Sequence, residues 1–539
     1  MDNTIAKKQI EEGKAYLGIE LGSTRIKGVL VGDDFSILAS GAHEWENKLV
    51  DGIWTYSIDD IWNGLRDCYR DLKNDVSKKY GITLHSFKTI GISAMMHGYM
   101  PFDEKGEILV PFRTWRNTIT EKAADELTEL FGFNIPQRWS IAHLYQAILN
   151  KEPHVKDIKY ITTLEGYVHW KLTGEKVLGI GDCAGMFPID GNAKAYNAVM
   201  VDKFNARIRE KGIDIKLLDI MPRLLLAGED AGVLTQEGAL MLDPTGDLKP
   251  GIKMCPPEGD AGTGMVATNS VARRTCNVSA GTSCFAMVVL EKDLENLHRE
   301  IDMVTTPDGL PVAMVHCNNC TSDLNAWVNI FEENLKLFGV NVDKNTIYEK
   351  LYTYAMQGDK DCGGLMSFPY FSGEHVTHMD SGMPMFLRKP DAAFNLANFM
   401  RTHLISSLGV LKLGMDILTN EENVKVDSVM GHGGLFKTKG VGQKILAALM
   451  NSPVTCMETA GEGGAWGAAL LAAFEDMGAG LTLPEFLNQK VFKDVKEVTL
   501  KPDSEDIKGV NEFMEEYKKL LPAEREAINA NRETEELVF

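Results

Sequence analysis

Residues 17–31 read LGIELGSTRIKGVLV, and this stretch predicts how the chain begins to fold. Leu17, Ile19 and Leu21 alternate with Gly and Glu, which is the two-residue period of a strand. Apolar residues resume after the Gly-Ser-Thr at 22–24, so we expect two strands joined by a tight turn. Glycine allows such a turn, and its backbone N–H groups and two hydroxyls can point at an anion. A single turn of this kind is more typical of an ordinary hairpin than of a binding loop.

A second copy of the pattern changes that interpretation. Residues 276–290 read CNVSAGTSCFAMVVL, with Ala-Gly-Thr-Ser at the turn, half a chain after the first hairpin. Two similar hairpins at this separation predict two similar domains, each of which presents a loop of donors sized for a phosphate. Strand and helix patterns alternate on both sides of the second hairpin, which indicates an α/β protein.

Composition limits the classes of function. The chain has 539 residues, of which 44% are hydrophobic and 24% charged, as in an ordinary two-domain globular protein. Its net charge of -20 argues against a nucleic-acid scaffold but allows a small anionic ligand. Nine cysteines, an odd number, predict reduced thiols and a cytoplasmic location. The polar N-terminus shows no signal peptide, and no run approaches the roughly 18 apolar residues of a membrane span.

Other segments can be assigned by period and by their caps. Residues 57–80 predict a helix that Ser57 caps and Gly81 ends. We also expect helices at 121–131, 141–150, 394–418, 442–451, 465–477 and 510–521, a long helix within 316–338, and strands at 36–42, 89–94, 108–112, 364–371, 424–430 and 454–457. A glycine-rich loop at 458–464 opens the helix at 465–477.

Several common enzyme motifs are absent from the sequence. There is no G-x-x-x-x-G-K-[ST] phosphate loop, no strand–GxGxxG–helix unit and no G-x-S-x-G elbow. Cys317 and Cys320 form a CxxC without the second pair that a zinc site needs, and without the context of a thioredoxin-like site. Buried thiols are the preferred interpretation of these two cysteines.

Asp260 is the strongest catalytic candidate on local sequence. Gly259, Ala261 and Gly262 surround it, so a ligand could approach its carboxylate and the backbone closely. A base here could remove a hydroxyl proton while the two donor loops hold a phosphoryl group, although a solvated turn is an equal alternative. His97, taken alone, fits a core or surface histidine. The glycine pairs at 433–434 and 463–464 begin helices after strands, where either a nucleotide or a plain turn fits.

Taken in order, these motifs resemble the FGGY carbohydrate kinases of the actin-like, ribonuclease-H-like ATPase superfamily. The resemblance runs from about residue 16 to about residue 475. The matching segments are Ile19-Glu20-Leu21-Gly22-Ser23-Thr24 with Lys27, Met96-His97-Gly98, Gly259-Asp260-Ala261-Gly262, Ser279-Ala280-Gly281-Thr282-Ser283, Pro369-Tyr370-Phe371-Ser372-Gly373-Glu374, Gly433-Gly434 with Lys437 and Gln443, and Gly467-Ala468-Ala469.

The resemblance implies two actin-like ATPase domains with an active-site cleft between them. We expect a sugar-binding domain at 12–266, a nucleotide-binding domain at 267–485 and a helical extension at 486–539. Asp260 would be the catalytic base, and Asp260 with Glu20 would hold Mg²⁺. The implied sugar ligands are Met96, His97, Gly98, Trp115 and Asp260, and the implied ATP ligands are Gly22, Ser23, Thr24, Lys27, Gly281, Thr282, Ser283, Gly433, Gly434 and Lys437.

Three departures from the family pattern affect metal and sugar binding. Glu20 stands where the family usually has Asp, Trp115-Arg116-Asn117-Thr118 replaces a Trp-Asn-Asp-x-Arg segment, and Ile405 replaces a glutamate. The pentulose kinases are most similar, so the expected substrate is L-ribulose or xylulose, with L-ribulose favoured by the 95–99 and 115–118 segments. A hexulose, polyol or aldonate kinase is an alternative, and so is a non-catalytic actin-like ATP-binding or sugar-sensing protein. The expected partners are the sugar and ATP, without nucleic acid or membrane, and a homodimer stays open.

Overall fold

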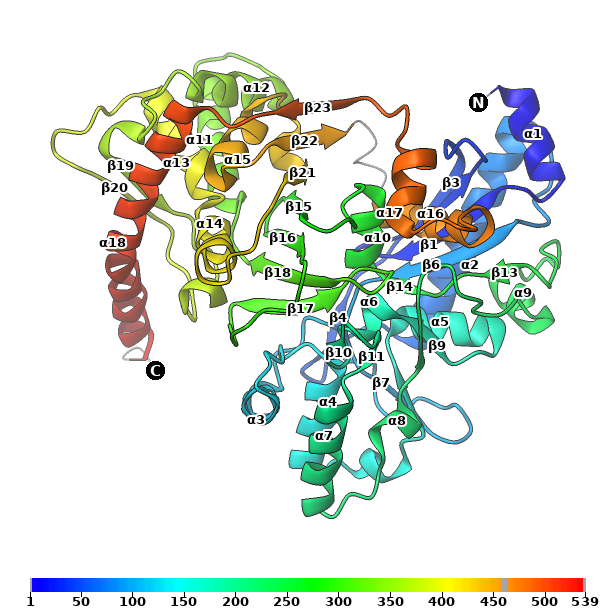
Figure 1. The fold of residues 1–539 in the computed structure, drawn as a ribbon. Coiled ribbons are helices and arrows are strands. Elements are labelled where there is room, and N and C mark those ends of the chain that lie inside the picture. Colours follow the sequence, from blue (N-terminus) through cyan, green and yellow to red (C-terminus); the bar gives the residue numbers. More distant parts are fainter. Residues whose placement is uncertain (1, 458–462, 537–539) are drawn as a thin grey trace.

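The computed structural model describes residues 2–457 and 463–536, with side chains through residue 531. Residues 458–462 of the predicted glycine-rich loop lie outside the described residues. The chain forms two main sheets, one in each half, and helices pack around both (Figure 1).

The first sheet begins with the predicted hairpin. β1 (Tyr16–Leu21) pairs antiparallel with β2 (Arg25–Val31), and β2 pairs with β3 (Ile37–Glu44). On its other side β1 runs parallel to β6 (Thr89–Ala94), which also pairs with β13 (Lys253–Met254) and β14 (Glu258–Gly259). The carboxyl ends of β1, β6 and β14 therefore meet at one edge of the sheet.

The second sheet repeats this plan. β15 (Thr275–Ala280), β16 (Cys284–Val289) and β18 (Pro311–Cys317) are antiparallel, and β17 (Ile301–Thr305) lies beyond β18. β15 runs parallel to β21 (Ser428–His432), followed by β22 (Val454–Met457) and β23 (Glu497–Leu500). The carboxyl ends of β15 and β21 also share one edge, so both predicted hairpins are confirmed in equivalent places.

The remaining elements cover the sheets and extend them. The helices of the first half are α1 (Asn3–Glu11), α2 (Ile58–Tyr80), α3 (Glu121–Phe131), α4 (Ser140–Leu149), α5 (Leu164–Thr173), α6 (Ile180–Cys183), α7 (Ala198–Glu210), α8 (Leu217–Ile220), α9 (Gln236–Leu242) and α10 (Asp260–Ala267). Those of the second half are α11 (Ser322–Leu337), α12 (Lys344–Ala355), α13 (Leu396–Ser406), α14 (Gly409–Asp416), α15 (Val441–Met450), α16 (Gly463–Met477), α17 (Leu483–Phe486) and α18 (Ser504–Glu536). Short strands are β4 (Lys48–Val50), β5 (Ile53–Thr55), β7 (Met100–Phe102), β8 (Tyr160–Thr162), β9 (Val177–Gly179), β10 (Ile189–Asp190), β11 (Ala195–Tyr196), β12 (Arg223–Leu225), β19 (Leu365–Phe368) and β20 (Met385–Arg388).

Local signals explain where the predicted elements begin and end. Ser57 accepts a hydrogen bond from the Asp60 N–H, and Gly81 adopts φ 67° after α2, as predicted. The strand predicted at 108–112 is wrong. Pro111 has no N–H to donate to a ladder, and the strand in this region is β7, which ends at Phe102. The predicted helix at 394–418 is two helices, which meet at Gly409, where Tyr517 of α18 packs. The long helix predicted within 316–338 is confirmed as α11, which begins at 322 because residues 316 and 317 belong to β18.

Helix α16 of the second half lies on the first sheet, beside β1 and β6 (Figure 1). A Cβ at Gly18 would lie 2.0 Å from the Ala465 carbonyl oxygen, and one at Gly91 would lie 2.3 Å from that of Ala468. Gly467 of α16 similarly meets Thr263 of α10, with 2.0 Å between a would-be Cβ and the carbonyl oxygen. These contacts require small residues, so the Gly-Ala-Ala helix joins the two halves. The division at residues 266 and 485 stays a prediction.

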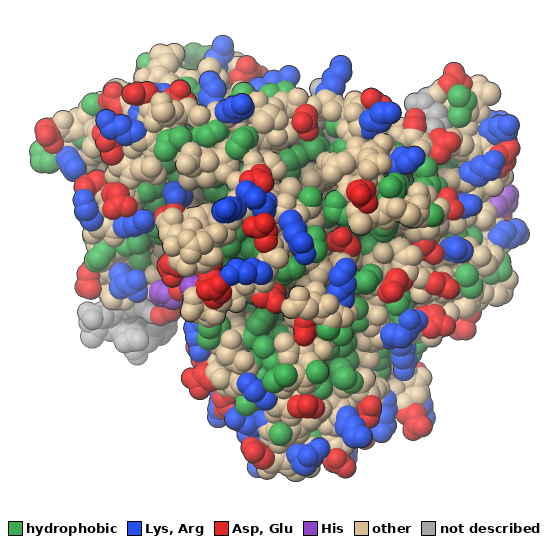
Figure 2. All heavy atoms as spheres, viewed as in Figure 1, with side chains coloured by type: hydrophobic (Ala, Val, Ile, Leu, Met, Phe, Trp, Pro, Cys, Tyr) green, Lys and Arg blue, Asp and Glu red, His purple; other side chains and the backbone are tan. Residues whose placement is uncertain are grey.

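The surface carries charges of both signs. Figure 2 shows that acidic and basic side chains are interspersed on this face, without one large basic patch. All nine cysteines are free thiols, and eight of them are buried. In the described part of the chain, no helix has the length and apolar character needed to cross a membrane.

Candidate active site

A cleft of about 1080 Å³ lies between the two halves. Its wall includes seven of the residues that the sequence pointed to, namely Glu20, Ser23, Met96, His97, Trp115, Asp260 and Ser283. The other predicted site residues do not line the cleft. Close in the chain to a lining residue are Gly22, Thr24, Gly98, Gly281, Thr282, Gly433 and Gly434, whereas Lys27 and Lys437 are farther along the chain. The carboxyl edges of both sheets thus supply one cleft, as the paired hairpins predicted.

Asp260 is the first residue of α10 and follows β14 directly. Its Oδ1 accepts a hydrogen bond from the Met96 N–H at 3.1 Å, which ties the carboxylate to the end of β6. Burial and the nearby Glu20 carboxylate raise the pKa of Asp260 to about 7. A carboxylate with this pKa is matched to proton transfer near neutral pH.

Glu20 lies near the end of β1 and faces the same cleft. Its Oε2 accepts the Ala465 N–H at 3.2 Å, close to the N-terminus of α16. Burial raises the pKa of Glu20, while this N–H and the charge of Lys27 oppose the rise. Glu20 and Asp260 therefore bring two carboxylates to one place, and oxygen ligands of this kind suit Mg²⁺.

His97 follows β6 in a left-handed backbone conformation, with φ 74°. Its Nδ1 lies 3.2 Å from the Gly185 carbonyl oxygen. A carbonyl can only accept, so Nδ1 carries the proton and Nε2 is left as an acceptor. Burial, together with the charge of Arg138, holds the pKa of His97 well below its usual range. The neutral imidazole can accept a hydrogen bond from a hydroxyl in the cleft.

Aromatic side chains hydrogen-bond to the backbone of the first turn, residues 22–24. Trp45 Nε1 donates to the Gly22 carbonyl oxygen at 2.7 Å, and the Tyr56 hydroxyl donates to that of Ser23 at 2.6 Å. The rings of Trp45 and Tyr56 stack on each other. Trp115 Nε1 lies 3.2 Å from Ser23 Oγ, so the predicted sugar ligand and the phosphate turn are in contact.

The second turn is held mainly by backbone groups. Gly281 accepts hydrogen bonds from the N–H and the hydroxyl of Thr321, at 3.1 and 2.7 Å, and the Cys320 N–H donates to Thr282 at 3.0 Å. Gly433, with φ 101°, packs so closely that a Cβ would lie 2.5 Å from the Ala280 carbonyl oxygen. The predicted adenosine loop and the second phosphate turn are therefore adjacent.

Lys437 and Gln443 have different surroundings. Lys437 is exposed just after the short 3₁₀ turn Gly434–Phe436. Gln443 is buried, and its Nε2 donates to the carbonyl oxygens of Val454 and Val498, at 2.7 and 2.6 Å. Gln443 thus joins α15 to the strands β22 and β23 and does not line the cleft.

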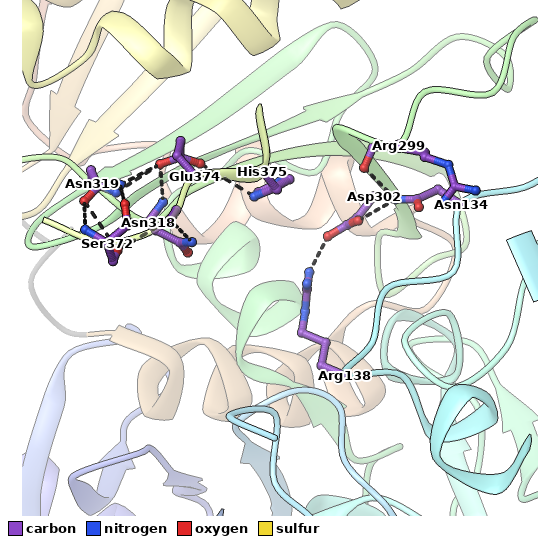
Figure 3. Close-up of polar contacts among 10 residues, drawn as sticks. Asn134, Arg138, Arg299, Asp302, Asn318, Asn319, Ser372, Glu374 and His375 are labelled. Atoms are coloured by element: carbon purple, nitrogen blue, oxygen red, sulfur yellow. Dashed lines mark hydrogen bonds and ion pairs between the residues drawn. The ribbon is translucent and has the colours of Figure 1, made fainter. Parts of the chain in front are cut away.

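Three polar residues of the cleft, Asn134, Arg138 and Asp302, could not be identified as site residues from the sequence. Arg138, just before α4, pairs with Asp302 of β17 and so connects the two halves (Figure 3). Asn134 Nδ2 also donates to Asp302 Oδ1, at 3.0 Å. Asp302 stands alone in an apolar strand and Arg138 in an unpatterned loop, so only the fold brings them together.

Glu374 of the Pro-Tyr-x-x-Gly-Glu run fixes the loop after β18 (Figure 3). Its Oε2 accepts the N–H groups of Asn318 and Asn319, at 2.9 and 3.2 Å. Burial raises its pKa to about 7, although these donors oppose the rise. Asn319 in turn accepts the N–H groups of Phe371 and Ser372. The resemblance identified Glu374, and its contacts show that it shapes the wall of the cleft.

The family comparison agrees with this geometry. Residues 15–246 match the model of the N-terminal domain of the FGGY family of carbohydrate kinases, and residues 276–475 match that of the C-terminal domain. The chain belongs to the FGGY family of carbohydrate kinases. This FGGY chain is therefore an ATP-dependent sugar kinase with two actin-like domains.

Individual relatives of this FGGY kinase are distant. It is 24% identical over 398 residues to the xylulose kinase of Haemophilus influenzae, covering 70% of this chain and 74% of that protein. It is 21% identical over 520 residues to the xylulose kinase of Lactococcus lactis, covering 94% and 96% of the two chains. The ligand-bound xylulose kinase structure from Lactobacillus acidophilus superimposes with a TM-score of 0.77 at 15% identity, over 95% and 98% of the two chains. The structural likeness confirms the predicted fold.

Proposed function

We propose that this kinase transfers the γ-phosphoryl group of ATP to the terminal hydroxyl of a ketopentose. The observation that carries the proposal is Asp260, a half-buried carboxylate with a pKa of about 7 that shares one cleft with His97 and both donor turns. The names of the relatives support a pentulose and favour xylulose as the first sugar to test, whereas the sequence segments alone favour L-ribulose.

In this proposal the first half binds the sugar and supplies the base. The His97 Nε2 accepts a sugar hydroxyl, and Met96, Gly98 and Trp115 shape the same end of the cleft. Deprotonated Asp260 accepts the proton of the terminal hydroxyl as that oxygen attacks the γ-phosphorus. The N–H and O–H donors of the two turns hold the phosphates, and the cleft excludes water from the transfer.

The remaining predicted residues would hold the nucleotide and its metal. Glu20 and Asp260 fit Mg²⁺, which takes one or two carboxylates and completes its shell with water and phosphate oxygens. The bound ion would neutralise phosphate charge. We assign the nucleotide to the loops around residues 22–24, 281–283 and 433–437, with Gly22, Ser23, Thr24, Lys27, Gly281, Thr282 and Ser283 at the phosphates and Gly433, Gly434 and Lys437 at the adenosine. We also expect the enzyme to act in the cytoplasm.

Coupled measurement of ADP release tests the proposal. The purified enzyme with Mg·ATP is assayed on xylulose and ribulose of both hands, a hexulose, a polyol and an aldonate. We expect the highest kcat/KM on a ketopentose. A higher value on a member of another class would contradict the pentulose assignment. Nucleotide binding without turnover on any sugar would instead favour a sugar-sensing or assembly protein.

A further inference from the structure

Three buried carboxyl groups lie behind the candidate site, and the mechanism does not use them. Glu165 on α5 and Asp182 on α6 are fully buried, and Glu258, the first residue of β14, is 2% exposed. Both Glu165 oxygens, Asp182 Oδ1 and Glu258 Oε1 lack a hydrogen-bond donor among the described residues. Buried polar atoms without a partner are costly, so this arrangement calls for a physical explanation.

A shared proton explains the first two groups. The carboxyl groups of Glu165 and Asp182 are hydrogen-bonding neighbours, which two carboxylates can be only if one is protonated. Asp182 Oδ2 also accepts the Thr163 hydroxyl at 2.6 Å, and the His97 N–H interacts with the same carboxylate. The donors therefore gather on Asp182, so Asp182 carries the charge and Glu165 keeps the proton. Burial and the Asp182 charge both raise the pKa of Glu165, in agreement with this assignment.

Asp182 lies close to two segments of the candidate site, the one that carries Asp260 and the one that carries His97. A Cβ at Gly259, the residue before Asp260, would lie 3.0 Å from Asp182 Oδ1. Three residues after Asp182, the Gly185 carbonyl oxygen meets His97 Nδ1, and a Cβ at Gly185 would lie 2.6 Å from that nitrogen. The 182–185 turn thus contacts His97 at its backbone and at its ring.

We propose that Asp182 is a positioning residue, which with protonated Glu165 behind it fixes His97 in its left-handed conformation for sugar binding. The His97 backbone has an unfavourable φ, and the Asp182 carboxylate interacts favourably with its N–H, which lowers the pKa of Asp182 and stabilises this backbone conformation. The Gly185 carbonyl then fixes the imidazole tautomer that leaves Nε2 as an acceptor. This proposal rests on the proposed function of His97 and names the support that His97 needs.

Steady-state kinetics on two pairs of variants test the proposal. Asp182→Ala should raise the KM for the sugar about tenfold while the KM for ATP stays within about twofold, as expected when the support of a binding residue is removed. Asp182→Asn keeps acceptors for the His97 N–H and the Thr163 hydroxyl, so it should recover most of the sugar affinity. Glu165→Gln is a neutral isostere of protonated Glu165 and should recover most of what Glu165→Met loses.

Three outcomes would overturn the proposal. They are an unchanged sugar KM in Asp182→Ala, an equal rise in both KM values, and a Glu165→Gln enzyme as impaired as Glu165→Met. If Asp182→Ala does not fold, the Glu165 pair still decides. If the wild-type enzyme phosphorylates no sugar, the proposed function fails, and a crystal structure of Asp182→Asn or Glu165→Met separates the two ideas. We expect His97 to rotate in Glu165→Met and to stay in place in Asp182→Asn, and an unmoved His97 in Glu165→Met would contradict the positioning role.

Discussion

The two hairpins have the same backbone plan but different chemistry at their turns. Glu20 lies two residues before Gly22 in the first hairpin, and Ser279 occupies the equivalent place before Gly281 in the second. The first strand therefore presents a carboxylate to the cleft, whereas the equivalent residue of the second strand carries only a neutral hydroxyl. A repeated fold supplied two similar donor turns, and the acidic chemistry is concentrated in the first half, where Asp260 also lies.

The two turns are also held by different groups. Aromatic side chains, Trp45 and Tyr56, bind the carbonyls of the first turn, whereas the second is bound largely by the backbone at residues 320 and 321. The first turn thus depends on particular side chains, and the second depends on close approach of backbone segments. Substitutions in each half should consequently fail in different ways.

Removal of the base should have the largest effect. We expect Asp260→Asn to lower kcat by about 10²–10⁴-fold, because the amide cannot accept the hydroxyl proton. Nucleotide binding should persist, since the donors of both turns remain. The measurements are coupled ADP release and calorimetric titration with ATP. Near-normal turnover would rule out Asp260 as the catalytic base.

Neutralising the other carboxylate should have a smaller effect. We expect Glu20→Gln to lower kcat/KM about tenfold or more at limiting Mg²⁺, because one of two carboxylate oxygen donors becomes a weaker amide. Excess Mg²⁺ should recover part of the loss, and Glu20→Asp should retain the Mg²⁺ response. Activity is measured against Mg²⁺ concentration at fixed ATP. A response identical to that of the wild type would remove Glu20 from the metal site.

Crowding the backbone in the second half should impair nucleotide binding. Gly433→Ala places a Cβ 2.5 Å from the Ala280 carbonyl oxygen in a backbone region that suits only glycine, at a cost of about 1–3 kcal/mol. The KM for ATP should rise about tenfold, with little change in the KM for the sugar. Gly339→Ala is the matched control, because Gly339 has φ 72° but no atom within 4 Å of a would-be Cβ. Equal ATP affinity in both variants would contradict the assignment of the 433–437 loop.

The smallest effect concerns pH. Asp260 must be deprotonated to act as a base, so kcat/KM should fall about tenfold per pH unit below its pKa, which is about 7 in the metal-free site and lower where Mg²⁺ binds the two carboxylates. The Glu20 charge contributes to raising that pKa, so Glu20→Gln should move the acid limb to lower pH. A pH–rate profile of both enzymes, each at saturating Mg²⁺, measures the shift. An acid limb that moves to higher pH would show that Glu20 does not raise the pKa of Asp260.

The sequence predicts structural elements correctly where the pattern depends on residues close together in the chain. The hairpins, the capped helix α2 and the order of the glycine-rich segments all depend on residues near one another in the chain. Prediction from the sequence failed at Pro111, where apolar character hid the missing N–H, and just before Gly409, where a segment with continuous apolar character forms two helices. Arg138 and Asp302 could not have been paired from sequence, because their proximity depends on how one half lies against the other. The same holds for Glu165 and Asp182, whose significance comes from burial.

Helix α16 has a consequence for how the polypeptide reaches its native state. Residues 463–477 cover one face of β1 and β6, where Gly18 and Gly91 allow close approach of the helix. A ribosome synthesises these residues long after the first sheet. Until then the nascent first half carries an uncovered apolar groove. A fragment that ends at residue 266 should accordingly aggregate when expressed alone, and supplying residues 267–539 as a separate chain should restore its solubility. The site of proton transfer is thus completed only after residues 463–477 have been synthesised.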